Sequence, residues 1–372
     1  MPNGIGRVNI MRKELILSAP VIDVFAGYAS MNNIILHSAK GQEWYMQNYL
    51  KIATFYSEKM DVIYFDYINI DSIYVTSNTS FQPDQYLNWP VNTYAFPTEQ
   101  VEPEDFIDFI RRQIDYGYYV YVFLNWKYLK EYGYHEDTYH EVFIYGYDDE
   151  EEVVLATGYV KGDNYGEVTH SYWDVTEAYR HMNVFLVENL EEVINRDIYR
   201  ISLLQYKENF HFQFSIPQFV IDLKAYLNLE KISSPIDVRN HHYRNAPFFY
   251  AYGNQMYDVL ACFIKNKCNQ GKDFDVREPY FVYNYMEGFL YRLRLLREKG
   301  YLKDDTYENE YKQVVKKGKV FFFTAMSYCG RVQSGEEIKD NPGEKMEQQL
   351  MVLKAMEKEI IMKIIKEFNH VR

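Results

Sequence analysis

Apolar residues recur with a helical period through several long segments of the chain. Apolar positions three and four residues apart are typical of amphipathic helices. In the N-terminal half this spacing predicts two helices within 31–60, separated near Lys40-Gly41, and a third over 102–116 that ends at Gly117, a natural C-cap. In the C-terminal half the same spacing predicts helices over 218–227, 253–265, 279–298, 308–329 and 344–366.

Between these two helical regions the pattern changes to that of buried strands. Segments 118–124, 141–147 and 152–156 are rich in β-branched and aromatic residues, 158–165 and 168–173 form a candidate hairpin, and a helix over 174–180 follows. Helices followed by mostly antiparallel strands indicate an α+β fold. The texture changes again near 195–210, so we predict a first domain over 1–200 and a mainly helical domain over 201–372.

Composition and charge narrow the class of protein. Hydrophobic residues make up 47% and aromatic residues 18% of the 372 positions, which excludes a disordered chain. The formal net charge of -13 disfavours nucleic acid as a partner. Apolar runs fall far short of the ~20 residues of a membrane span, and the N-terminus lacks a secretory pattern, so we expect a cytoplasmic protein. Three cysteines without paired spacing indicate neither a disulfide framework nor a metal site.

Two residues stand out as candidates for chemistry. Ser30 lies at the predicted start of a helix, where positive potential and N–H groups would activate a nucleophile and hold an oxyanion. Ser is also a preferred N-cap residue, which is the alternative interpretation. His140 lies at the entrance of a predicted buried strand, where it would serve either in proton transfer or as a structural residue. A third group that orients the His would normally be Asp or Asn on the next strand.

The order of these residues resembles that of papain-like cysteine peptidases. In particular, the motif H-x-x-x-x-Y-G-Y-D-D that begins at His140 resembles the N-terminal domain of the butirosin-pathway acyltransferase BtrH, and more loosely the bacteriocin-leader peptidases. Relatives of this type include amide synthases of thiotemplated peptide pathways, such as the closthioamide enzyme CtaG. By motif the resemblance covers residues 20 to 190, and the helical second part fits the family's two-part layout.

The resemblance implies a fold, a reaction and partners. It implies a papain-like N-terminal domain that takes an acyl group from a thioester on the phosphopantetheine arm of an acyl or peptidyl carrier protein and passes it to a small-molecule amine, in antibiotic or non-ribosomal peptide biosynthesis. It implies no bound cofactor. Position 30 would be the nucleophile, His140 the base and acid, and Thr157 the orienter of the His. Tyr28 and Asn33, beside position 30, are the candidate substrate-binding residues.

The chain departs from the family pattern at two positions. Ser30 stands where the family has Cys, and a hydroxyl needs stronger base assistance than a thiol. Thr157 stands where the family has an acidic residue, so Asp163 and Asn164 are alternative orienters. Three explanations of Ser30 stay open: replacement of a natural Cys, natural use of Ser, or a pseudoenzyme. The alternative functions are accordingly a peptidase or amidase of the same fold, and a non-catalytic binding or self-protection protein.

Two helical faces bear on the question of partners. Arg292, Arg294 and Arg297 form a predicted basic face that would suit an acidic carrier protein or would simply be solvated. The apolar stripe over 344–366 must be buried within the chain or against a second copy, so a homodimer stays open.

Overall fold

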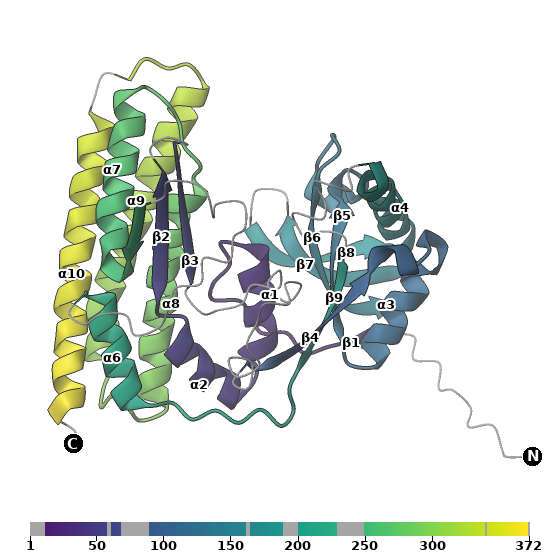
Figure 1. The fold of residues 1–372 in the computed structure, drawn as a ribbon, viewed down its shortest axis with the longest axis horizontal. Helices are drawn as coiled ribbons and strands as arrows, with labels where there is room; N and C mark the ends of the chain where they lie inside the picture. The colour runs from purple at the N-terminus through teal and green to yellow at the C-terminus, as the bar shows by residue number, and fades with distance from the viewer. Residues whose placement is uncertain are drawn as a thin grey trace, which may run out of the picture. The chain divides into compact units, whose positions relative to one another are not determined.

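The computed structural model describes seven ranges of the chain, and their described residues form two compact units (Figure 1). The described ranges are 12–57, 61–67, 89–160, 164–188, 200–228, 249–338 and 341–370. The first unit is assigned the ranges Met1–His37 and Asp71–Phe210. The second unit is assigned Ser38–Ile70 and His211–Arg372. The sequence predicted a single boundary at residue 200, whereas the segment 38–70 joins the helical unit.

The first unit is built on a seven-stranded antiparallel sheet. Its main order is β4-β9-β5-β6-β7-β8, and β1 pairs with β6. The predicted strands 118–124, 141–147 and 152–156 are confirmed, but β7 pairs with β8 along its whole length, so the predicted hairpin of 158–165 with 168–173 is wrong. The strands are β1 (Arg12–Glu14), β4 (Val91–Pro97), β5 (Tyr119–Asn125), β6 (Tyr139–Asp148), β7 (Val153–Val160), β8 (Asn164–Ser171) and β9 (Arg200–Tyr206).

Helices cover both faces of this sheet. Helix α1 (Ala26–Ile35) lies on one face, and α3 (Phe106–Asp115) and α4 (Tyr172–Glu188) lie on the other (Figure 1). The predicted helix over 102–116 is confirmed as α3, and Gly117 follows it with φ of 83°, as a C-cap requires. A continuous apolar core fills the space between the sheet and α3 and α4. Its members include Phe106, Ile110, Val122, Val142, Ile144, Val154 and Tyr179.

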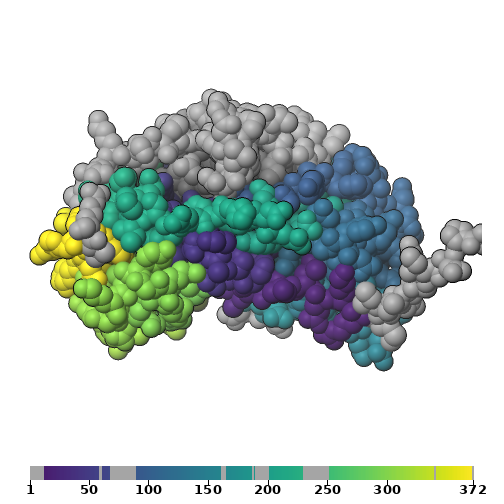
Figure 2. Space-filling model, turned by 90° about the horizontal axis from the view of Figure 1, so that it is seen from below, coloured from purple at the N-terminus to yellow at the C-terminus, as the bar shows by residue number. Residues whose placement is uncertain are grey.

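The second unit combines helices with a small sheet. The five helices predicted in the C-terminal half are confirmed, and a three-stranded antiparallel sheet has the order β10-β2-β3. Seen from below, α10 in yellow and the light-green part of the chain that includes α9 lie side by side (Figure 2). The elements are α2 (Ala39–Asn48), β2 (Ile52–Ser57), β3 (Val62–Tyr67), α6 (Ile216–Tyr226), β10 (Phe249–Tyr252), α7 (Met256–Asn269), α8 (Arg277–Glu298), α9 (Thr306–Gln333) and α10 (Pro342–His370). Among the described residues, no helix is long and apolar enough to cross a membrane.

The prediction that helix continues through 49–60 is wrong over 49–57, and its last residues, 58–60, lie outside the described residues. Helix α2 ends at Asn48, and β2 begins at Ile52. The segment is rich in β-branched and aromatic residues, and it pairs with β10 on one side and β3 on the other. Pairing on both edges satisfies the backbone of β2, so the tertiary partners override a spacing that also fits a helix.

Of the two helical faces that bore on partners, the apolar stripe is buried and the basic face is buried at one residue. Arg292 has no exposed surface: its Nε donates to the Met46 carbonyl over 2.8 Å, and its Nη2 donates to the Tyr49 carbonyl. The predicted basic face is therefore wrong at this residue. The apolar stripe of α10 is buried within the second unit, so it gives no reason to expect a second copy. Its buried members include Met346, Leu350, Leu353, Ile360, Ile361 and Ile364.

Candidate functional site

Helix α1 places Ser30 one turn later than the sequence suggested. The helix begins at Ala26, and its N-cap residue Phe25 has extended backbone angles and makes no side-chain capping bond. The Ala29 N–H already donates to the Phe25 carbonyl over 3.0 Å. Ser30 is thus the fifth helical residue, and the N-cap interpretation is wrong. The first-turn N–H groups, which carry most of the positive end of the helix dipole, belong to residues 26–28.

The hydroxyl of Ser30 is held by its own helix. Ser30 has no exposed surface, and its Oγ donates to the Ala26 carbonyl over 2.7 Å. This bond from a serine to the carbonyl four residues earlier is a common way to satisfy a hydroxyl within a helix. The second partner is the Tyr165 hydroxyl at 3.4 Å. Neither partner is a base that would accept the serine proton at neutral pH.

The hydroxyl of Tyr165 on β8 contacts three of the residues that were candidates from the sequence. It lies 2.7 Å from Thr157 Oγ1 on β7 and accepts from Asn33 Nδ2 over 3.3 Å, in addition to the contact with Ser30. Asn33 Nδ2 also lies 3.4 Å from Thr157 Oγ1. We call Ser30, Asn33, Thr157 and Tyr165 the α1 polar cluster. Burial raises the pKa of Tyr165 to about 12, although its hydrogen bonds oppose the shift, so its hydroxyl is neutral at physiological pH.

His140 lies on the other face of the sheet. In β6 it pairs with Leu124, whereas Phe143 pairs with Thr157. Side chains alternate along a strand, so His140 shares the face of Leu124, and Thr157 shares the face of Phe143. The His140 ring lies 4.4 Å from that of Trp126, which belongs to the core beneath α3 and α4. The His140 ring also lies 6.3 Å from that of Tyr159, which in turn lies 5.4 Å from the Tyr165 ring. Ser30 and Thr157 both contact the Tyr165 hydroxyl, whereas His140 approaches the α1 polar cluster through the Tyr159 ring.

His140 contacts its neighbour Glu141. Its Nδ1 accepts from the Glu141 N–H over 3.0 Å when it is unprotonated and pairs with the Glu141 carboxylate when it is protonated, and its side chain is 38% exposed. Thr157, the predicted orienter, belongs to the α1 polar cluster. Of the alternative orienters, Asp163 and the side chain of Asn164 lie outside the described residues.

Two further residues beside Ser30 are structural. Asn32 Oδ1 accepts from the N–H groups of Val21 and Ile22 over 3.2 and 3.1 Å, and its Nδ2 donates to the Tyr28 carbonyl over 3.1 Å. These bonds fix the segment that leads into α1. Tyr28, a candidate substrate-binding residue, is buried, and its ring lies 6.2 Å from that of Phe25.

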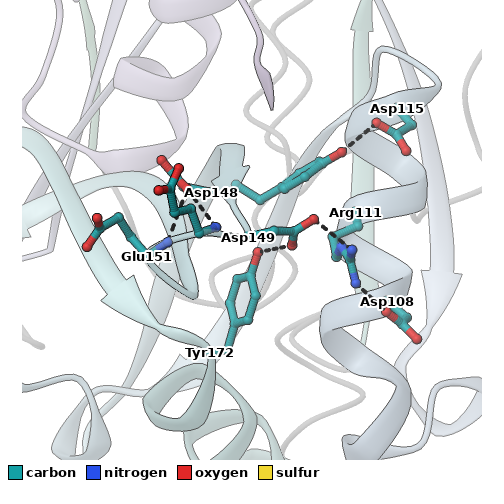
Figure 3. A network of polar contacts seen from close by, with 9 residues as sticks. Asp108, Arg111, Asp115, Asp148, Asp149, Glu151 and Tyr172 are labelled. Atoms are coloured by element: carbon teal, nitrogen blue, oxygen red, sulfur yellow. Dashed lines mark hydrogen bonds and ion pairs between the residues drawn. The ribbon is translucent and has the colours of Figure 1, made fainter. Parts of the chain in front are cut away.

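The end of β6 farthest from His140 carries a polar network that joins the β6–β7 turn to α3 and α4 (Figure 3). Asp149 accepts from Arg111 over 2.7 Å and from the Tyr172 hydroxyl over 2.8 Å. Asp148 Oδ1 accepts from the N–H groups of Glu150 and Glu151 over 3.0 and 3.2 Å, which shapes the turn. These carboxylates hold the Y-G-Y-D-D part of the motif in place and do not orient His140.

A second histidine with a carboxylate partner was not predicted from the sequence. His170 on β8 is fully buried, and its Nδ1 lies 2.8 Å from Glu131 Oε2, a bond that lowers the pKa of Glu131. Its ring lies 4.9 Å from that of Tyr132, which stacks on Trp126 at 4.2 Å. Among the described residues, the buried polar atoms His170 Nε2, Tyr132 Oη and Trp126 Nε1 find no hydrogen-bond partner. The only sequence signal was a polar residue at the inward position between Val168 and Tyr172.

Comparisons with known proteins and the search for metal ligands add no assignment. No protein-family model matches the chain, and no curated protein matches it. Within the described ranges, no three His, Cys, Asp or Glu side chains come together as metal ligands would.

Proposed function

We propose that the chain is a non-catalytic binding protein of the papain-like type, which recognises an acylated phosphopantetheine arm without forming an acyl-enzyme. The observation that carries this proposal is the environment of Ser30. Its Oγ is buried, donates to a backbone carbonyl, and has a neutral tyrosine as its other partner. A nucleophilic serine needs an adjacent base and access to the substrate carbonyl, and this hydroxyl has neither.

The position of His140 supports the same proposal. A papain-like mechanism needs the base within about 2.6–3.2 Å of the nucleophile, or within reach through one water. His140 instead shares a sheet face with Leu124 and stacks near Trp126. The Tyr159 ring lies between the rings of His140 and Tyr165, at 6.3 and 5.4 Å from them, so a conformational change that united His140 with Ser30 would have to move this ring aside.

The second candidate is the acyltransferase or amide synthase that the sequence resemblance implies. It is favoured by the convergence of Ser30, Asn33 and Thr157, from distant parts of the sequence, on Tyr165. If position 30 reacts, Asn33 would be the nearest side-chain amide to a developing oxyanion. A peptidase of the same fold would use the same residues with water as the acceptor.

Intact-mass analysis combined with calorimetry separates the candidates. The given protein, Ser30→Ala and Ser30→Cys are each incubated with a series of acyl-pantetheine thioesters. The non-catalytic proposal predicts saturable binding by all three proteins and no covalent adduct on the given protein. Ser30→Ala is the matched control, because it removes the hydroxyl and keeps the helix.

Each other result has a definite meaning. An acyl adduct that maps to position 30 of the given protein, and disappears when an amine is added, would establish the acyltransferase. Adduct formation that ends in free acid without an amine would indicate a hydrolase. Neither binding nor an adduct with any of the thioesters would overturn both proposals for this arm.

A further inference from the structure

Helix α9 carries an unusual concentration of positive charge. From Tyr311 to Gln333 the sequence contains four lysines and one arginine and no Asp or Glu. The chain as a whole has a formal net charge of -13. This stretch is therefore a local reversal of the protein's charge, and it lies on a single 28-residue helix.

The lysines share one face of α9 with exposed apolar residues. The inner face of the helix is buried at Val314, Gly318, Phe321 and Ala325. On the opposite side, positions three, four and seven residues apart fall on one outward stripe. We call this stripe the α9 face, and its members are Lys312, Lys316, Lys319, Val320, Phe323 and Met326.

The apolar part of the α9 face is open to solvent. Val320 is 54%, Phe323 52% and Met326 42% exposed. Single exposed apolar residues are normal on a protein surface, but three on successive turns of one helix are typical of an interaction site. From Lys312 to Met326 the helix rises 14 times by about 1.5 Å, so the α9 face is about 21 Å long. This length matches about four turns of a partner helix.

The charge of the α9 face is only partly neutralised. Lys312 lies 3.5 Å from Glu308, and the Lys319 ammonium lies 5.8 Å from the Phe323 ring. Within the described residues, Lys316 and the neighbouring Lys317 form no ion pair. Cations beside an exposed aromatic ring favour a partner that supplies both carboxylates and apolar side chains.

We propose that the α9 face docks an acidic amphipathic helix of a separate partner protein. A second copy of this chain fits less well, because a two-fold interface would gather the lysines of both copies while no member of the α9 face supplies a carboxylate to neutralise them. An anionic membrane also fits less well, because the protein's net charge of -13 would be repelled by the lipid headgroups and only three lysines on this face would attract them. An acidic helix complements both the lysines and the apolar residues, and this inference does not depend on the proposed function.

The test uses the full chain and a defined probe. The probe is a stapled 20-residue helical peptide with leucines along one face and glutamates flanking them, labelled with a fluorophore. We expect saturable binding by anisotropy at micromolar concentrations of protein, weakened by added salt. The double variant Lys316→Glu with Lys319→Glu should bind at least ~10-fold more weakly, and Phe323→Ala ~3- to 10-fold more weakly.

A matched variant on α10 controls for general charge and surface effects. Lys358→Glu with Met362→Ala changes one exposed lysine and one exposed methionine on the neighbouring helix and should leave binding unchanged. Equal binding by the wild type and the α9 variant, or no binding at all, would overturn the proposal. Binding to phosphatidylserine vesicles that is lost in the α9 variant, or self-association that is lost with it, would replace the helix by a membrane or by a second copy.

Discussion

The Tyr226 hydroxyl donates to Glu357 Oε2 over 2.5 Å, and both side chains are buried in the helical unit. Tyr257 donates to the same oxygen over 2.9 Å, and Tyr311 donates to the other oxygen. The carboxylate thus joins α6, α7, α9 and α10. Burial raises the pKa of Glu357 even though the three hydroxyls favour its charged form.

We expect Glu357→Ala to destabilise the protein by about 3–5 kcal/mol, because it leaves three buried hydroxyls without their acceptor and opens a cavity. Glu357→Gln keeps the shape and one acceptor and should cost about 1–2 kcal/mol. Urea denaturation of the full chain measures both. Glu359→Ala, at an exposed position of the same helix, is the control and should change the free energy of unfolding by less than about 0.5 kcal/mol. Equal losses for Ala and Gln would mean that the shape of the side chain does not matter and that the effect comes from the second carboxylate acceptor alone.

Glu278 should make stability depend on pH near neutrality. Burial, with the nearby Asp275 charge, raises the pKa of Glu278 to about 8, and no residue in the described ranges gives its Oε2 a hydrogen bond. A carboxyl whose folded pKa is raised binds its proton more tightly in the folded state. The free energy of unfolding should therefore fall as pH rises from about 4.5 to 8, by roughly 2–4 kcal/mol.

Glu278→Gln removes the titrating group and should flatten this part of the pH profile. The comparison is the difference in unfolding free energy between pH 5 and pH 8 for the two proteins, measured by urea denaturation. If the wild type and Glu278→Gln lose stability in parallel, the carboxyl of Glu278 is not the group responsible.

The α1 polar cluster should depend on Tyr165 more than on Ser30. Tyr165→Phe removes the hydroxyl that contacts Thr157, Asn33 and Ser30, and we expect a loss of about 1–3 kcal/mol. Ser30→Ala should be within about 0.5 kcal/mol of the wild type, because alanine has the higher helix propensity. A double-mutant cycle between Tyr165→Phe and Thr157→Val should reveal coupling, and strict additivity of the two changes would argue against the 2.7 Å bond.

Gly253 should tolerate no side chain. Its φ is 54°, and a Cβ built there would lie 2.1 Å from the Tyr226 carbonyl oxygen. We expect Gly253→Ala to destabilise the protein by about 2–4 kcal/mol, since both backbone strain and a backbone clash are involved. Gly271 has φ of 64° with open space around it, so Gly271→Ala should cost only about 1 kcal/mol. Thermal melting of the two variants separates strain from the clash.

Periodicity predicted most of the helices because each one buries a single stripe. Helices α7 to α10 were found from apolar spacing alone, and their ends differ by only a few residues from those predicted. Strand β2 was missed because its alternation is masked by burial on both faces, so Ile52 and Phe55 also fit a helical spacing. A short apolar segment can form a helix or a strand. Its tertiary partners decide between the two, and these partners are distant in the sequence.

The candidate site was less predictable than the fold. The sequence analysis assigned Ser30 and Thr157 to one catalytic site with His140. Both contact the hydroxyl of Tyr165, which carries no motif. The face of the sheet that the His140 side chain occupies depends on the register of β6. A shift of one residue in this register would move the side chain to the other face. Arg292 looked like a surface cation because its neighbours Arg294 and Arg297 are partly exposed, and only its contacts with the carbonyls of α2 reveal it as a buried link.

Because Ser38–Ile70 belongs to the helical unit, the order in which the ribosome makes the chain separates β2 from one of its partner strands. Strand β2 emerges early, yet one of its two partners, β10, is translated roughly two hundred residues later. The edge of β2 that pairs with β10 therefore stays unpaired while the strands of the first unit's main sheet are synthesised. Contacts so far apart in sequence slow folding and expose such an edge to aggregation, so a chaperone that shields nascent chains should raise the yield of this protein.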